Sequence, residues 1–203
     1  MKTLTIKNMP LLDEGNIIDF SYTFSNNDIH IVYSKHAQTL KSLSNIIFYC
    51  ERDLVGDIYY CGIDLRDFDK TTYRKSIISK VENNYEYLNY FTTLEYLKLY
   101  SLQKEKISYY LRYFGFSSDK LDKQLRDLTD DEKLIIELAK PYIKGSQIIL
   151  FDLFFDALED KAKCTYLKKI KFLNKSLGIT QIILSSLNDW DSDEFLIIKL
   201  NRE

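Results

Sequence analysis

The chain has 203 residues, with 30 acidic side chains, 28 basic side chains and a net charge of −2 at pH 7. A hydrophobic fraction of 45% is enough to bury a core, which excludes a wholly disordered chain, and the absence of a basic surplus argues against a nucleic-acid-binding protein. The three cysteines (Cys50, Cys61 and Cys164) lack metal-ligand spacing and are expected to be reduced thiols. No apolar run reaches the ~18 residues of a membrane span and the first residues do not form a signal peptide, so we expect a soluble chain.

Alternating apolar and polar residues predict strands in the first third of the chain, with one helix among them. The expected elements are strands over 1–8, 17–24 and 29–33, and a helix that opens at Lys41-Ser42 and carries Leu43, Ile46 and Ile47. Within 56–65 we expect a strand, a turn at Cys61-Gly62 and a further extended residue pair.

Helical periodicity follows over 91–116 and 121–143, where the second segment is expected to contain two helices separated at Leu128-Thr129. In the last third of the chain, the hydrophobic pattern predicts a buried strand over 147–155, a helix over 160–178, a buried strand over 180–186 and a final strand over 194–200. Apolar strands that alternate with helices indicate parallel βαβ units, in which ligands bind beyond the carboxyl ends of the strands.

The segment from His30 to Cys50 has the layout of a phosphate-binding loop: strand, loop, Lys-Ser and helix. Its loop contains no glycine, because registering G-x-x-x-x-G-K-[ST] on Lys41 and Ser42 places Lys35 and Leu40 at the glycine positions. A leucine at position 40 is expected to crowd a phosphate. A register one residue earlier, counted back from Gly56, would place Leu40 at the lysine position, and an ordinary solvated Lys-Ser at a helix start is the alternative to both.

Six segments together resemble the ATP-binding subunit of ABC transporters, in that family's motif order and at about its spacing. VYSKHAQTLKSL stands at the Walker A position, GDIYYCGIDL resembles the hairpin that follows it, and KVENNYEYLNYFTTLEYLKLY resembles the Q-loop region. LRDLTDDEKLIIELAKPYI resembles the signature helix, IILFDLFFDALED resembles Walker B and the D-loop, and ITQIILSSLND resembles the strand before the switch histidine.

The resemblance implies an α/β fold of the P-loop NTPase type, with a mainly parallel core sheet, an N-terminal antiparallel β part and a helical insertion. It implies a single domain over 1–203, with 1–80 and 140–203 forming the core and about 85–139 forming a helical subdomain.

The residues at the family's functional positions differ from its pattern. Lys41 and Ser42 would hold phosphate and Asp152 would hold magnesium, but Leu153 replaces the catalytic glutamate and Leu187 replaces the switch histidine. Leucine can neither accept a proton nor orient water. The remaining changes are Asn83 at the Q-loop glutamine, Glu159 at the D-loop aspartate, and Leu11 near the adenine-stacking aromatic.

The LTDDE segment places Asp130 and Asp131 where the family's signature grips a phosphate, and two carboxylates there should repel it. The alternative explanation is structural, because Thr129 and Glu132 have the spacing of a helix capping box. His30 and His36 have no neighbouring Cys or Ser at a spacing that would indicate a metal site or a triad. The aromatic stretch Tyr85–Phe91 would suit either protein contacts or core packing.

These replacements predict a non-catalytic ABC ATP-binding-protein-like subunit that is a structural or regulatory partner of a membrane permease, of an intact ABC ATPase, or of both. It would form a homodimer or heterodimer in the cytoplasm at the inner face of the cell membrane, and it would bind no nucleic acid. No cofactor is expected, and Mg-ATP bound through Lys41, Ser42 and Asp152 is the alternative. A weak ATP-binding subunit still coupled to transport and a plain α/β protein-interaction domain are the two other hypotheses.

Overall fold

The structure is a computed structural model that describes residues 3–13, 15–49, 55–83, 89–191 and 193–200. Its contacts divide the chain into two compact units, one formed by 1–80 and 147–203 and the other by 81–146. The strands are β1 (Leu4–Asp13), β2 (Asn16–Phe24), β3 (Ile29–Tyr33), β4 (Asp57–Tyr60), β5 (Ile63–Asp64), β6 (Ile78–Val81), β7 (Ile148–Asp152), β8 (Thr180–Ser185) and β9 (Leu196–Lys199). The helices are α1 (Ala37–Ile47), α2 (Lys70–Thr72), α3 (Thr93–Lys98), α4 (Lys104–Phe114), α5 (Asp130–Lys144) and α6 (Asp160–Leu177).

The first unit contains two sheets of different kinds. One has the strand order β6-β7-β8-β3-β9, and its β7–β8, β8–β3 and β3–β9 pairs are parallel. The other has the order β2-β1-β4-β5 and is antiparallel. This arrangement confirms the α/β fold with a mainly parallel core sheet and an N-terminal antiparallel part.

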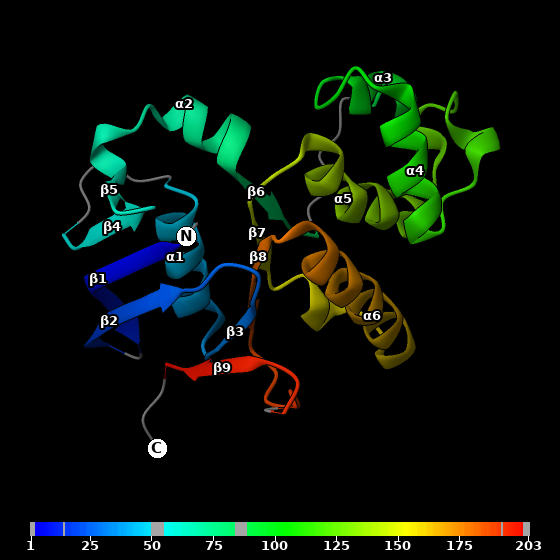
Figure 1. Ribbon diagram of the computed structural model, residues 1–203. Coiled ribbons are helices and arrows are strands. Elements are labelled where there is room, and N and C mark those ends of the chain that lie inside the picture. Colours follow the sequence, from blue (N-terminus) through cyan, green and yellow to red (C-terminus); the bar gives the residue numbers. More distant parts are fainter. Residues whose placement is uncertain (1–2, 14, 50–54, 84–88, 192, 201–203) are drawn as a thin grey trace. The chain divides into compact units, whose positions relative to one another are not determined.

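Helix α1 packs between these two sheets, against β1 on one side and against β7 and β8 on the other (Figure 1). Alternate residues of each parallel strand face α1, since side chains of a strand point to its two faces in turn. Leu150 of β7 and Leu184 of β8 therefore lie in the same buried cluster as Leu40 and Leu43 of α1. Burial of this apolar cluster fixes α1 beside the carboxyl ends of β3 and β7.

The core of the first unit also holds a completely buried histidine, His30 in β3. Its Nε2 lies 3.2 Å from the carbonyl oxygen of Ser25 and its Nδ1 lies 3.2 Å from the hydroxyl of Tyr22. A neutral ring that donates to Ser25 and accepts from Tyr22 satisfies both contacts. Burial lowers the pKa of His30 below its ordinary value.

The second unit is helical, and its helix starts follow the expected local rules. The capping box at α5 is confirmed, because Thr129 N donates to Glu132 (2.9 Å) and Glu132 N donates to Thr129 Oγ1 (3.3 Å). Pro141 does not end α5, which continues to Lys144. No helix among the described residues combines the length and apolar character needed to cross a membrane.

Candidate functional site

The connection between β3 and α1 is much shorter than the sequence pattern suggested. Strand β3 ends at Tyr33 and α1 begins at Ala37, so only Ser34, Lys35 and His36 connect them. The prediction that the helix opens at Lys41-Ser42 was wrong by one turn. His36 is the N-cap residue and makes no side-chain capping hydrogen bond, so the sequence carried no capping signal for this helix start.

The first turn of α1 already uses several of the groups that a phosphate loop would present to its ligand. The amides of Thr39 and Leu40 both donate to the carbonyl oxygen of His36, at 3.1 and 3.3 Å. The hydroxyl of Thr39 lies 2.8 Å from a carboxylate oxygen of Asp13 and 3.0 Å from the carbonyl oxygen of Leu12. A phosphate loop works because consecutive free amides converge on the anion, and two of those amides here are bonded inside the helix.

Leu40 does not project over this turn. Its side chain is completely buried in the cluster between α1 and the two sheets. The expectation that its isobutyl group crowds a phosphate path was therefore wrong. Its effect is structural, because it anchors the first turn of α1 to the core.

Asp152 at the end of β7 is the centre of the candidate site, and one of its oxygens receives three donors. Oδ2 lies 3.1 Å from Lys41 Nζ, 3.0 Å from Lys80 Nζ and 2.7 Å from Ser44 Oγ. Lys41 and Ser44 are three residues apart and so share one face of α1. The structure thus joins the predicted Lys41 and Asp152 but brings Ser44, not Ser42, to the carboxylate.

Lys80 and Ser44 were not among the residues predicted for this site. Lys80 comes from β6, next to β7 in the sheet, and the burial of β6 does not alternate, so no pattern in the sequence pointed to this residue. The side chain of Asp152 is only 1% exposed, and its Oδ1 has no hydrogen-bond partner within the part of the chain that the structure describes. Two ammonium groups around one carboxylate leave a local charge of about +1.

A magnesium ion, which the resemblance implies, fits this arrangement poorly. An ion bound to Asp152 at about 5 Å from each ammonium group would be repelled by about 7 kcal/mol per group at an effective dielectric constant of about 20. Attraction to the carboxylate at about 3 Å offers only about 11 kcal/mol on the same scale. The two repulsions are therefore comparable in size with the single attraction and cancel most of it. Within the described ranges, no group of three or more His, Cys, Asp or Glu residues suited to a metal occurs.

Leu153 follows Asp152 and is the residue predicted to stand at the family's catalytic-glutamate position. Its φ of 54° is left-handed, so β7 ends at Asp152, three residues before the expected end at residue 155. Its side chain packs against the buried cluster of α1, and its amide donates to the carbonyl oxygen of Leu184 at 3.2 Å. An apolar side chain held this way supplies no general base.

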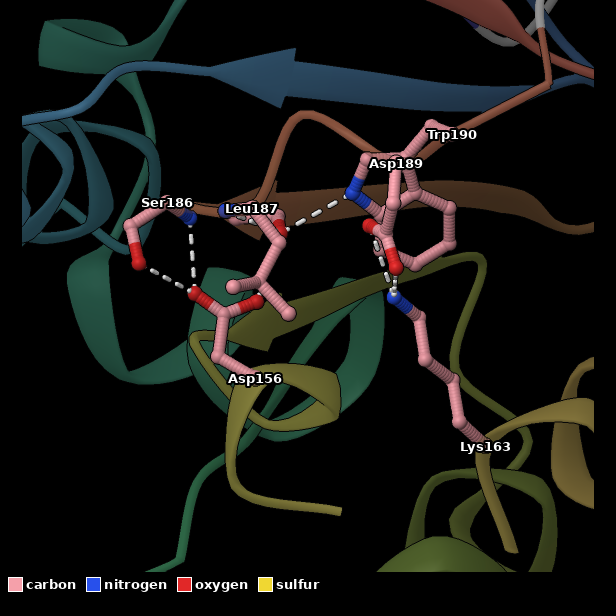
Figure 2. A network of polar contacts seen from close by, with 7 residues as sticks. Asp156, Lys163, Ser186, Leu187, Asp189 and Trp190 are labelled. Atoms are coloured by element: carbon pink, nitrogen blue, oxygen red, sulfur yellow. Dashed lines mark hydrogen bonds and ion pairs between the residues drawn. The ribbon is translucent and has the colours of Figure 1, made fainter. Parts of the chain in front are cut away.

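The segment after β8 is held by Asp156, four residues beyond Asp152. Ser185 Oγ donates to one carboxylate oxygen of Asp156 at 2.5 Å. The amide and hydroxyl of Ser186 donate to the other oxygen at 2.7 and 2.8 Å (Figure 2). Leu187, predicted to stand at the switch-histidine position, is 37% exposed, and its backbone N–H donates to Ser185 Oγ.

A second contact fixes the same segment to α6. Lys163 Nζ donates to both carboxylate oxygens of Asp189, at 3.0 and 2.9 Å, and lies 4.2 Å from the centre of the Trp190 ring (Figure 2). The indole nitrogen of Trp190 donates to Ser185 Oγ at 2.9 Å. Glu159, the predicted D-loop equivalent, is the N-cap residue of α6 and makes no side-chain capping bond.

The other predicted positions lie in the helical unit and are described separately. Asp130 and Asp131 are the first residues of α5, where acidic side chains favour a helix start, and Asp130 makes an exposed contact of 3.6 Å with Lys133. Asn83 follows β6 and is half-buried. Of the aromatic stretch Tyr85–Phe91, residues 85–88 lie outside the described residues, while Tyr90 is 78% exposed.

Comparison with known proteins shows which proteins this chain resembles in sequence and in fold. No family model matches the sequence. The methionine import ATP-binding protein MetN 1 of Staphylococcus aureus, in strains MSSA476 and N315 among others, is 22% identical over 177 residues, which cover 82% of this chain and 52% of the relative. The chain thus spans about half the length of the curated relatives it matches.

Solved structures agree over almost the whole chain. The dimeric ABC transporter cassette MJ0796 superposes with a TM-score of 0.79 at 18% identity, covering 97% of this chain and 94% of that one. A putative ABC transporter ATP-binding protein from Pyrococcus furiosus gives 0.76 at 18% identity, covering 98% and 97%. An Atm1-family ABC exporter with ATP bound gives 0.75 at 17% identity, covering 98% of this chain and 37% of that one. The chain has the fold of an ABC ATP-binding cassette.

Proposed function

We propose that this chain is a non-catalytic subunit of the ABC ATP-binding-protein type, a structural or regulatory partner of a membrane permease, of an intact ABC ATPase, or of both. The observation that carries the proposal is the β3–α1 connection. Residues 37–40, which a phosphate loop would wrap around its ligand, are instead the first turn of α1. Two of their amides bond to His36, and Leu40 is in the core.

The positions of the other replaced residues support the same role. Leu153 offers an apolar side chain directly after Asp152, and Leu187 offers one after β8. A water molecule needs a nearby acceptor to become a nucleophile, and neither leucine supplies one. The fold would be kept for its surfaces, while hydrolysis would depend on another chain.

The cassette fold and the names of the relatives support a place in a transporter. MetN 1 is named an ATP-binding protein of methionine import, and MJ0796 was solved as a dimer. For this chain we propose association with a permease at the inner face of the membrane, through a homodimer or heterodimer. Because both its Walker A and its signature positions are altered, each composite site formed with an intact partner would contain an altered half.

Hydrolysis by the purified chain tests the proposal. Phosphate release from Mg-ATP by the wild type should equal that of the Asp152→Ala variant, because the wild type has no competent site to lose. Release that is at least tenfold faster in the wild type would refute the non-catalytic role. A folding check by circular dichroism on both proteins ensures that the comparison is between folded chains.

Weak ATP binding is a second candidate, since the Lys41 side chain remains 47% exposed at the carboxyl end of the parallel sheet. Calorimetry with Mg-ATP, wild type against Lys41→Ala, separates the two. Saturable micromolar binding that the variant loses would favour a nucleotide-binding subunit, and absence of heat in both would favour the structural role. The third hypothesis, an interaction domain of unrelated fold, loses its basis because the fold is that of an ABC cassette.

A further inference from the structure

Asp152 joins three elements of the first unit through a single oxygen atom. Lys41 and Ser44 reach it from α1, and Lys80 reaches it from β6, while Asp152 itself ends β7. The side chains of Asp152 and Lys80 are only 1% and 13% exposed, so both charges are largely withdrawn from water. A buried carboxylate requires counter-charge and hydrogen bonds, and Oδ2 has both from within the chain, while Oδ1 has no hydrogen-bond partner among the described residues.

The two ammonium groups do what a divalent cation bound at this place would do. They neutralise Asp152, and they connect the helix beside the sheet to the strands within it. Unlike a metal ion, both are covalently part of the chain and cannot dissociate. The surplus positive charge also opposes the entry of a further cation.

From this geometry we infer that Lys41 and Lys80 are built-in replacements for a metal ion at Asp152, so that the charge of this carboxylate is balanced without a divalent cation. The inference deepens the proposed non-catalytic role but has a separate test. It concerns the intact chain alone and needs neither nucleotide nor partner.

A manganese titration tests the metal-free site. Free Mn²⁺ is followed by electron paramagnetic resonance in solutions of the wild type and of Asp152→Asn, without nucleotide. Both should lack saturable binding in the range of about 10⁻⁴–10⁻³ M that weak oxygen sites in proteins reach. Binding by the wild type that Asp152→Asn loses would overturn the inference, whether or not the chain hydrolyses ATP.

A double-mutant cycle tests whether the lysine supports the carboxylate. Lys80→Met, Asp152→Asn and the double variant are compared with the wild type by urea unfolding, with the exposed Lys161→Met as the matched control. Lys80→Met should lower the folded-to-unfolded ratio about tenfold more in the presence of Asp152 than in its absence. Additive effects of the two substitutions would overturn the inference even if no metal binds. ATP hydrolysis by a chain that binds no Mn²⁺ in the absence of nucleotide would refute only the proposed non-catalytic role.

Discussion

Replacing Asp156 by asparagine removes one charge while keeping the size of the side chain. The carboxylate now accepts three hydrogen bonds, one from Ser185 and two from Ser186. In Asp156→Asn, the amide oxygen can keep both bonds from Ser186, but the amide nitrogen must face Ser185 Oγ. That oxygen already accepts from the amide of Leu187 and from the indole of Trp190, and its own proton loses its acceptor.

The expected loss follows from this change. A hydrogen bond to a charged group contributes about 1.5–3 kcal/mol, and one such bond is lost while the other two become neutral. Since Ser185 is buried and Asp156 is only partly buried, we expect the free energy of unfolding to fall by about 2 kcal/mol, which is about 30-fold in the folded-to-unfolded ratio.

Tryptophan fluorescence during urea unfolding is the natural assay, because Trp190 is the only tryptophan of the sequence and belongs to this network. The native emission maximum should also shift to longer wavelength as the indole becomes more exposed. Asp67→Asn, at an exposed carboxylate, is the matched control and should change the unfolding midpoint little. If both variants unfold at the same urea concentration with the same native spectrum, Asp156 does not hold this segment.

Three further predictions concern stability. Burial lowers the pKa of His30 in the folded chain below its value in the unfolded chain, so the free energy of unfolding should fall as the pH drops below about 6.5. In urea titrations, His30→Gln should lose less free energy of unfolding between pH 7 and pH 5 than the wild type. Gly56→Ala should lower the free energy of unfolding by about 2 kcal/mol, and with it the melting temperature, because the added Cβ would lie 2.6 Å from the carbonyl oxygen of Asn8. A melting temperature equal to that of the wild type would contradict this contact. Thr129→Ala should cost about 1 kcal/mol by removing half of the α5 capping box, while Thr129→Ser should cost much less, a difference that chemical denaturation can measure.

The parallel strands and the start of α5 were predicted well from local sequence patterns, because these elements are determined by residues that are neighbours in the sequence. The apolar runs around Leu150 and Ile183 are typical of strands buried on both faces, and Thr129 and Glu132 carry their own capping signal. The start of α1 could not be read in this way. His36 provides no cap, and the burial of Leu40 stabilises a helical turn that no local signal marks.

The contacts of the candidate site depend on tertiary structure, because they join residues that lie far apart in the sequence. Lys80 and Ser44 reach Asp152 across 72 and 108 residues of chain, and no spacing rule connects them. The resemblance identified Asp152 because it ends a buried strand. It assigned Ser42 and not Ser44, because the register of a glycine-free loop is not fixed by its residues.

The place of β3 in the middle of the parallel sheet has a consequence for synthesis on the ribosome. Its neighbours β8 and β9 come about 150 residues later in the chain. At about 5–20 residues per second, β3 emerges on the order of 10–30 s before either of them exists. During that interval the apolar side chains and the unpaired backbone groups of β3 are exposed, whereas the β1–β2 hairpin can pair at once. We therefore expect nascent chains that stop before residue 180 to depend on chaperones and to aggregate when chaperones are depleted.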